Sequence, residues 1–350
     1  ATGFHTRAPV EILETGYGTP EEKCRLLQAL ADAVSVPVTP AFPVADAASV
    51  GALPLPPLLS SVVVEGRAED RAVWLDPSSE VAPFQMIPAD FRGKPGLLLS
   101  SASDGQFFEN VPRDMPFPEK QDIHVEAAIN ADGKLTAKIG YTLRGDEELF
   151  LRAAFHRTPK EQWREVAAMV AAANGFRGQI ASVNASDPSA TQDPFRFEYQ
   201  IVQPGFVEWT KSPTRVPAPL PFLRLPQLPA KASAEGRVHA IDLRMPLEAS
   251  VKCSLQLPPG TEVRAPAGTS VSRDYASYSS KYEARGSKLN ASRHLRFILR
   301  EIPEERTADY AAFLRAVEND QSQLFLLNSK VPAAAPPSAA KDSTARAPQP

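Results

Sequence analysis

The chain has 350 residues, 43% of them hydrophobic and 23% charged, which is typical of a globular protein large enough for two domains. Its formal net charge of -3, with no basic stripe interleaved with aromatic residues, argues against nucleic-acid binding. No apolar run approaches the roughly 20 residues of a membrane span. The two cysteines are too few for a disulfide framework or a structural zinc site, and the sequence predicts no metal and no cofactor.

The most strongly marked element is a helix that begins at Thr19 and Pro20. Thr19 has the chemistry of an N-cap, Pro20 suits the first helical position, and Glu22 completes a capping box. Cys24 lies one turn inside the helix, on its apolar side. The apolar positions that recur at helical spacing are Leu27, Leu30, Ala31 and Val34. The helix is expected to end before Pro37 and to be followed by a strand over Val36–Phe42.

Short β segments follow this helix. Residues 43–60 are rich in Pro and Ala and indicate a loop. Ser61–Glu65 and Ala72–Leu75 are short β runs on either side of a polar turn, and together they predict a hairpin. Leu97–Ser100 is a further short apolar segment.

From about Asp122 the sequence alternates between apolar and polar residues. Ile123–Ile129 and Leu135–Leu143 flank a turn and predict an antiparallel hairpin. Helices are expected over Gly145–Phe155 and Pro159–Asn174. The further strands expected are Ile180–Ala185, Phe195–Val202, Phe206–Trp209, Arg237–Leu243 and Glu248–Leu257, with a long antiparallel pair formed by Val271–Glu283 and Leu289–Glu301.

The chain closes with a helix and a tail. Thr307–Glu318 places Tyr310, Phe313, Leu314 and Val317 on one helical face, and Gln323–Leu327 is a short apolar end. Residues 331–350 contain mainly Pro, Ala and Ser and are expected to be disordered. The sequence therefore predicts an α+β fold. Residues 1–100 would form a helix on a small antiparallel sheet, and 101–330 a β-rich domain with two or three helices.

Two of these segments carry a resemblance to a known family. Residues 16–42, GYGTPEEKCRLLQALADAVSVPVTPAF, follow the plan of a Gly-Asp-Cys-Lys-Asp-Lys turn, a Leu-rich helix and a Pro-containing strand. Trp74–Ser78, followed by Val81–Phe84, is similar to a Trp-Leu-Asp-Pro-Thr strand end with a Pro-aromatic pair. The chain thus resembles bacterial transglutaminase-like proteins, a papain-like Cys–His–Asp family with an accessory domain of unknown function ahead of the core.

The resemblance continues, with less specific motifs, to about Asn328. It implies an extracytoplasmic bacterial protein, periplasmic or secreted. It also implies that this chain lacks the N-terminal β domain of the family and the first helices of the core.

The resemblance further implies a catalytic triad that has lost two members. The nucleophilic cysteine of the family corresponds to Pro20, its histidine base to Ser61, and its orienting acid to Asp76. Because Pro carries no nucleophile and Ser is a poor base, this site is expected to be inactive. Cys24 lies about four residues, roughly 5–6 Å, further along the helix, where the helix dipole has faded, and no motif places a histidine beside it.

We therefore expect a non-catalytic scaffold or binding module whose partner is a protein or a component of the cell envelope. Two alternatives stay open. Cys24 could serve a thiol-dependent hydrolase or acyltransferase, with a histidine brought in by the fold. The chain could also be a β-sandwich envelope or adhesion protein with a helix packed on it. A disulfide between Cys24 and Cys253 is a further open alternative, beside a packing role for Cys24 in the core.

Overall fold

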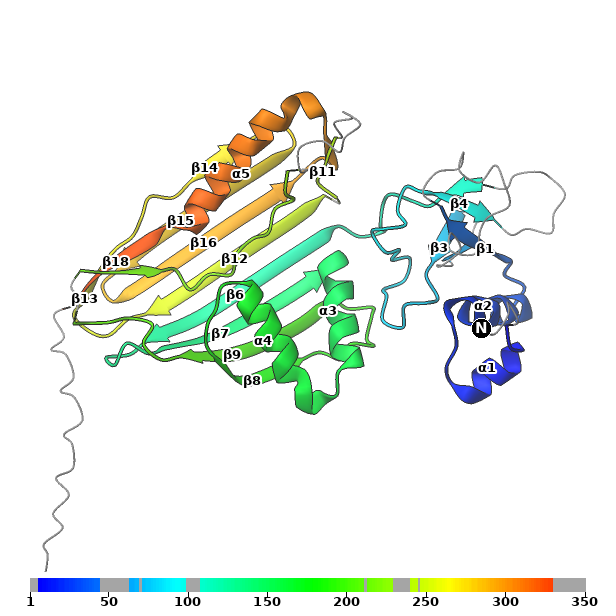
Figure 1. Ribbon diagram of the computed structural model, residues 1–350, viewed down its shortest axis with the longest axis horizontal. Coiled ribbons are helices and arrows are strands. Elements are labelled where there is room, and N and C mark those ends of the chain that lie inside the picture. The colour runs from blue at the N-terminus through cyan, green and yellow to red at the C-terminus, as the bar shows by residue number, and fades with distance from the viewer. Residues whose placement is uncertain are drawn as a thin grey trace, which may run out of the picture.

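The computed structural model describes residues 6–44, 63–68, 71–98, 108–210, 213–228, 240–244 and 246–329. These residues form an α+β fold built on a five-stranded sheet and an eight-stranded sheet, with two smaller sheets beside them (Figure 1). The α+β class predicted from the sequence is thereby confirmed. The predicted tail at 331–350, Ser61 and most of the predicted loop at 43–60 lie outside the described residues. The domain division near residue 100 stays a prediction.

Two helices open the described chain, α1 (Pro9–Thr15) and α2 (Pro20–Ala33). The predicted capping box of α2 is confirmed. The backbone N–H of Glu22 donates to the Thr19 hydroxyl at 3.3 Å, and the Glu22 carboxylate accepts from the Thr19 backbone N–H at 3.0 Å. Glu22 also pairs with Arg7 at 2.7 Å, so the same carboxylate fixes the start of α2 to the segment before α1.

The first sheet is antiparallel and has the strand order β3-β2-β1-β4-β5. Its strands are β1 (Val38–Pro43), β2 (Val63–Ala68), β3 (Arg71–Leu75), β4 (Pro95–Leu98) and β5 (Phe108–Asn110). The predicted hairpin is confirmed as β2 and β3. Helix α2 packs on one face of this sheet through Cys24 and Leu27, which contact Phe42, Val64 and Leu97. Trp74 and Val63 belong to a second apolar cluster of the same unit.

The second sheet has eight strands in the order β14-β15-β16-β12-β6-β7-β9-β8. Every neighbouring pair is antiparallel except β12 and β6, which are parallel. The predicted hairpin at 123–143 is confirmed as the pair β6 and β7. The strands are β6 (Glu119–Ile129), β7 (Leu135–Arg144), β8 (Gln179–Ala185), β9 (Phe195–Gln203), β12 (Leu247–Gln256), β14 (Ser270–Ser272), β15 (Ala276–Arg285) and β16 (Lys288–Phe297).

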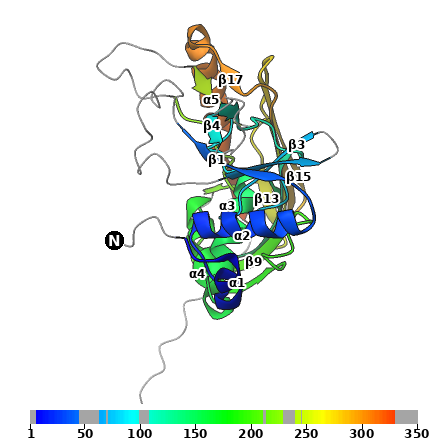
Figure 2. The same ribbon diagram turned by 90° about the vertical axis from the view of Figure 1, so that its right-hand side faces the viewer.

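All three helices of this part cover the same face of the eight-stranded sheet (Figures 1 and 2). Helices α3 (Asp146–Arg157) and α4 (Trp163–Ala173, after a 3-10 turn at Lys160–Gln162) lie over β6 to β9, and α5 (Thr307–Gln321) lies over the other half. Their apolar faces form one core with the inward strand residues. The opposite face carries exposed polar side chains such as His124, Glu126 and Lys138.

Two small sheets complete the fold. Strand β18 (Leu324–Ser329) lies between β10 (Thr214–Pro217) and β13 (Thr261–Arg264), and β11 (Ile241–Asp242) pairs with β17 (Glu301–Ile302). The sequence did not predict β5, β10 or β13, and of β17 it predicted only Glu301, the end of the expected strand Leu289–Glu301. Strands of two to four residues are too short to show a periodic pattern.

Two predicted strands differ from the structure. Phe206–Trp209 forms no strand, because it covers the turn between β6 and β7. The Val207 N–H donates to the Gly133 carbonyl at 3.0 Å, and the Trp209 indole donates to the Asn130 carbonyl at 3.1 Å. The predicted strand at 271–283 is divided into β14 and β15 by residues 273–275, where Arg273 and Tyr275 bind Asp309 of α5.

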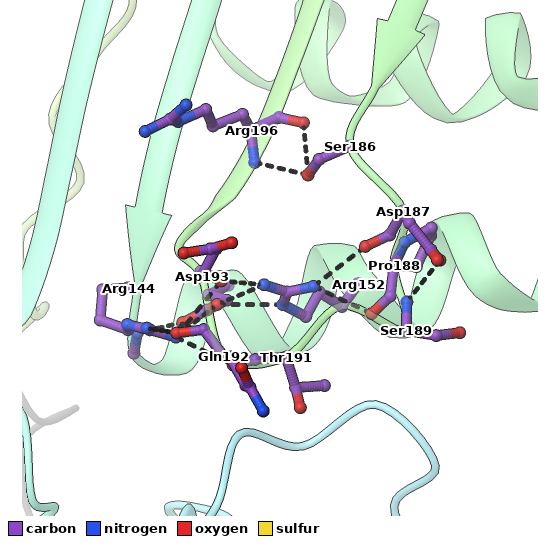
Figure 3. Close-up of polar contacts among 12 residues, drawn as sticks. Arg144, Arg152, Ser186, Asp187, Pro188, Ser189, Thr191, Gln192, Asp193 and Arg196 are labelled. Carbon is purple, nitrogen blue, oxygen red and sulfur yellow. Dashed lines mark hydrogen bonds and ion pairs between the residues drawn. The ribbon is translucent and has the colours of Figure 1, made fainter.

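The buried side chain of Arg152 fixes α3 to the loop between β8 and β9 (Figure 3). Arg152 and Glu148 are both 0% exposed and lie 2.9 Å apart, one helical turn from each other. Arg152 also donates to three carbonyl oxygens of that loop, those of Asp187, Pro188 and Asp193. Arg144 binds Glu148 as well, at 3.1 Å. Arg144 also donates to loop carbonyls, those of Thr191, Gln192 and Asp193. The shape of the loop therefore depends on two guanidinium groups, because its carbonyl groups accept their hydrogen bonds.

The two large sheets meet at a charged contact. Arg92, between β3 and β4, forms a two-pronged ion pair with Asp146 at the start of α3. Glu119 begins β6 beside this pair and is buried. Burial, together with the nearby Asp146 carboxylate, raises the pKa of Glu119 to about 8. A glycine is required at position 145, next to Glu119. Its φ is +106, and a Cβ there would lie 2.6 Å from the Glu119 Cγ.

Replacing Arg152 with Met should lower the free energy of unfolding by about 3–5 kcal/mol, because Glu148 would lose a buried partner and the loop carbonyls would lose a donor. Urea unfolding measures this change. Arg157→Met, at an exposed position of the same helix, is the matched control and should change the free energy by less than about 0.5 kcal/mol. Equal losses in the two variants would contradict the structural role of Arg152.

Glu119 should make stability fall as the pH rises. The folded protein holds this proton up to about pH 8, whereas the unfolded chain releases it near pH 4.5, so the stabilising effect of the proton is complete below pH 4.5 and is lost between the two values. Glu119→Gln should remove that loss, so the stability of this variant relative to the wild type should increase as the pH rises from about 5 to about 8.5. Melting temperatures measured across this range test the effect. Glu126→Gln on the exposed face is the control. Parallel curves of melting temperature against pH for the wild type and Glu119→Gln would refute the role of Glu119.

Candidate functional site

The structure places the predicted triad positions as follows. Pro20 is the first residue of α2. Asp76 follows β3 and is buried, and its Oδ1 accepts hydrogen bonds from the Ser78 N–H at 2.9 Å and the Ser78 hydroxyl at 2.5 Å. Burial raises the pKa of Asp76, and the hydrogen bonds from Ser78 oppose that shift. Asp76 therefore closes the turn after β3, as a capping carboxylate does.

Cys24 lies in an apolar environment. Its side chain is buried against Phe42, Val64 and Leu97. Burial, with a smaller effect from Glu21, raises the pKa of the Cys24 thiol to about 11. A buried thiol with a raised pKa has the properties of a core residue and lacks those of an activated nucleophile.

Cys24 and Cys253 are both free thiols, so the disulfide left open from the sequence is not formed. The physical reason is that they occupy different cores. Cys24 packs between α2 and the five-stranded sheet, whereas Cys253 points into the core of the eight-stranded sheet.

One histidine is connected to α2 through a pair of ionic contacts. His156, at the end of α3, lies 3.2 Å from Glu80, and Glu80 pairs with Lys23 of α2 at 2.6 Å. Glu80 and His156 are 76 residues apart, so no local pattern could have predicted this contact. The chain of charges connects α2 to α3 at the surface and supplies no base to a nucleophile.

The site best formed for binding is a groove between α3 and α4. It encloses about 260 Å³, with its floor on β6 and β7 and one side closed by residues 222 and 224. Three of its apolar side chains stay exposed to solvent: Phe150 at 65%, Met169 at 62% and Phe222 at 44%. Large apolar side chains gathered around one hollow are typical of an interaction site.

A few polar groups line this groove. The Tyr141 hydroxyl lies 3.4 Å from that of Tyr199 and accepts from the Asn174 amide, so it is already satisfied. Glu147, in the first turn of α3, makes no hydrogen bond or ion pair within the described residues. Burial raises the pKa of Glu147, and the positive charges of Arg224 and Arg244 oppose that shift. Among the described residues, no cysteine or histidine lines the groove.

Sequence patterns identified the two helices and missed the groove. Val166 and Val170 of α4, at helical spacing in the sequence, line the groove wall. Phe150 and Met169 lie beside the buried stripes of their helices and point away from the core. Large apolar residues at exposed helix positions were the signal available in the sequence, although such residues are common on ordinary surfaces.

The described residues hold neither a metal-binding cluster nor a helix that could cross a membrane. No group of three or more His, Cys, Asp or Glu side chains there could hold a metal ion. Within the same residues, none of the helices has the length and apolar character needed to cross a bilayer.

Comparison with known proteins gives a partial match. Residues 217–327 match the family DUF3858, a domain of unknown function with a solved structure. Among solved structures, that of a candidate protease from Parabacteroides distasonis is similar to this chain, with 13% sequence identity and a TM-score of 0.43. The similar region covers 93% of this chain and 47% of the protease chain. This chain thus spans about half the length of that protein. A search of curated proteins finds no match.

Neither thiol should react with Ellman's reagent in the native protein at about pH 8, because both are buried and burial raises the pKa of Cys24 to about 11 and that of Cys253 to about 12. Absorbance at saturating reagent measures the reaction. Both thiols should be titrated once the chain is unfolded in guanidinium, which serves as the positive control. Rapid native release of one equivalent, removed by Cys24→Ala, would show that Cys24 is accessible.

Proposed function

We propose that this chain is a non-catalytic, transglutaminase-like binding module. The observation that carries the proposal is the environment of Cys24, which is buried among apolar side chains that raise the pKa of its thiol. Pro20, in the place of the nucleophile, has no reactive group, and the carboxylate of Asp76 is engaged by Ser78. The residues that the resemblance assigns to chemistry therefore serve as structural groups.

The groove between α3 and α4 supports the second half of the proposal. It combines exposed apolar side chains with the carboxylate of Glu147, which makes no hydrogen bond or ion pair within the described residues, a combination suited to binding. The match to DUF3858 names no activity for residues 217–327. The extracytoplasmic bacterial setting implied by the resemblance is part of this proposal.

The β-sandwich alternative gains no support from residues 20–98. There α2 packs directly on the antiparallel sheet through Cys24 and Leu27. This is the helix-on-sheet unit that the transglutaminase-like hypothesis requires.

Activity assays test the proposal. Under reducing conditions between about pH 6 and pH 9, where a cysteine enzyme would work, the purified protein should hydrolyse neither labelled casein nor acyl-anilide substrates, and it should not couple dansylcadaverine to casein. Cys24→Ala should give the same background rate as the wild type, and Cys253→Ala is the matched control. Thiol-dependent turnover that Cys24→Ala abolishes would overturn the proposal and favour the hydrolase or acyltransferase alternative.

A further inference from the structure

The groove between α3 and α4 has the size of a pocket for a side chain of a partner protein. Its volume of about 260 Å³ is below the roughly 300–1,000 Å³ that enclose free small ligands. Phe150, Met169 and Phe222 extend the apolar surface beyond the hollow itself. A small hollow with a broad apolar rim matches the way protein partners insert one large residue and cover the surface around it.

One wall of the groove is held in place from both sides. The Phe222 ring packs on Gly175 at the end of α4, where a Cβ would lie 2.6 Å from the ring. The backbone N–H of Leu223 donates to the Gln321 side chain of α5 at 2.6 Å, and the Gln321 amide donates back to the Leu223 carbonyl at 3.1 Å. The groove is therefore formed before any partner binds, which lowers the entropic cost of binding.

The charge at this groove selects the partner. Glu147 lines it, is partly withdrawn from water, and has no hydrogen-bond or ion-pair partner among the described residues. A carboxylate in that position is stabilised by a cation that arrives with the ligand, since a partly buried charge gains more from pairing than an exposed one. Burial raises the pKa of Glu147, and the positive charges of Arg224, which also lines the groove, and of Arg244 oppose that shift, but neither forms a hydrogen bond or ion pair with it within the described residues. The Arg224 guanidinium donates instead to the Ala173 carbonyl at 3.5 Å, at the end of α4.

We propose that the groove binds a peptide segment of a partner protein, which inserts one large apolar side chain between Phe150, Met169 and Phe222 and pairs a neighbouring Lys or Arg with Glu147. This inference rests on the proposed function, because it names the partner class of a binding module. The apolar residue supplies most of the affinity, and the basic residue supplies the selectivity.

Selection from a phage library of random twelve-residue peptides, carried out on the intact chain, tests this inference. Enriched peptides should share a Leu, Met, Phe or Trp next to a Lys or Arg. A synthetic, fluorescently labelled form of the most enriched peptide should bind in solution, as measured by anisotropy. Met169→Glu should weaken that binding at least about tenfold, because it places a charge on the apolar rim. Leu30→Glu, at an exposed apolar position of α2, is the matched control and should leave binding unchanged.

A double-mutant cycle tests the pairing of Glu147 with the basic residue of the peptide. Glu147→Gln should weaken binding of the selected peptide about threefold to tenfold, and replacing the basic residue of the peptide with Gln should cost the same amount. The two changes combined should cost no more than either alone. Glu165→Gln, at an exposed position of α4, is the control. Circular dichroism and melting temperatures show that each variant is folded.

Several results would overturn this inference. They are the absence of any enriched motif, a motif without a basic residue, or binding that Met169→Glu leaves intact. Self-association in sedimentation, or binding to vesicles of phosphatidylglycerol and phosphatidylethanolamine, would also overturn it if Met169→Glu abolished either, because the groove would then hold a second copy or a lipid surface. None of these outcomes affects the absence of thiol-dependent turnover, so the proposed lack of catalysis is judged separately.

Discussion

The parallel pairing of β6 with β12 determines the architecture of the larger part of this protein. The pairing aligns Ile123 with Val251, Val125 with Cys253, and Ala127 with Leu255, and all six side chains are buried. Because side chains alternate along a strand, this register turns the apolar rows of both halves toward the same face. The three helices can then cover one continuous core. The DUF3858 match at 217–327 includes β12 but not β6, so the matched segment supplies only one side of this pairing.

The groove follows from the same arrangement. Helices α3 and α4 cover one half of the sheet and α5 covers the other, and the chain that crosses between the halves lies against both α4 and α5. That crossing segment brings Phe222 to the open side of the α3–α4 pair. The buried pair of Arg152 and Glu148, with the bonds from Arg152 to the loop between β8 and β9, holds α3 in position, so the wall that carries Phe150 depends on this charge interaction of the same helix.

Local sequence patterns predicted most of the helices and hairpins, because their causes lie within a few residues. The capping box at Thr19 and Glu22 predicted the start of α2, and the alternation on either side of Asn130–Gly133 predicted the hairpin of β6 and β7. The same method was wrong in assigning Phe206–Trp209 to a strand. The apolar residues there pack on a distant turn instead of extending a sheet. Periodicity shows that a side chain is buried, and it does not identify the surface against which it packs.

The sequence by itself determined that this chain is an α+β protein with a capped helix whose first position holds Pro20, where a proline has no nucleophile to offer. Only the tertiary structure decided what surrounds Cys24, which residues fix α3, and where a partner could bind. Capping and alternation are interactions between near neighbours and can be recognised in the sequence. Burial of a thiol, the position of His156 beside Glu80, and the approach of Phe222 to Met169 depend on residues far apart in the chain, which only the packing of the sheets brings together.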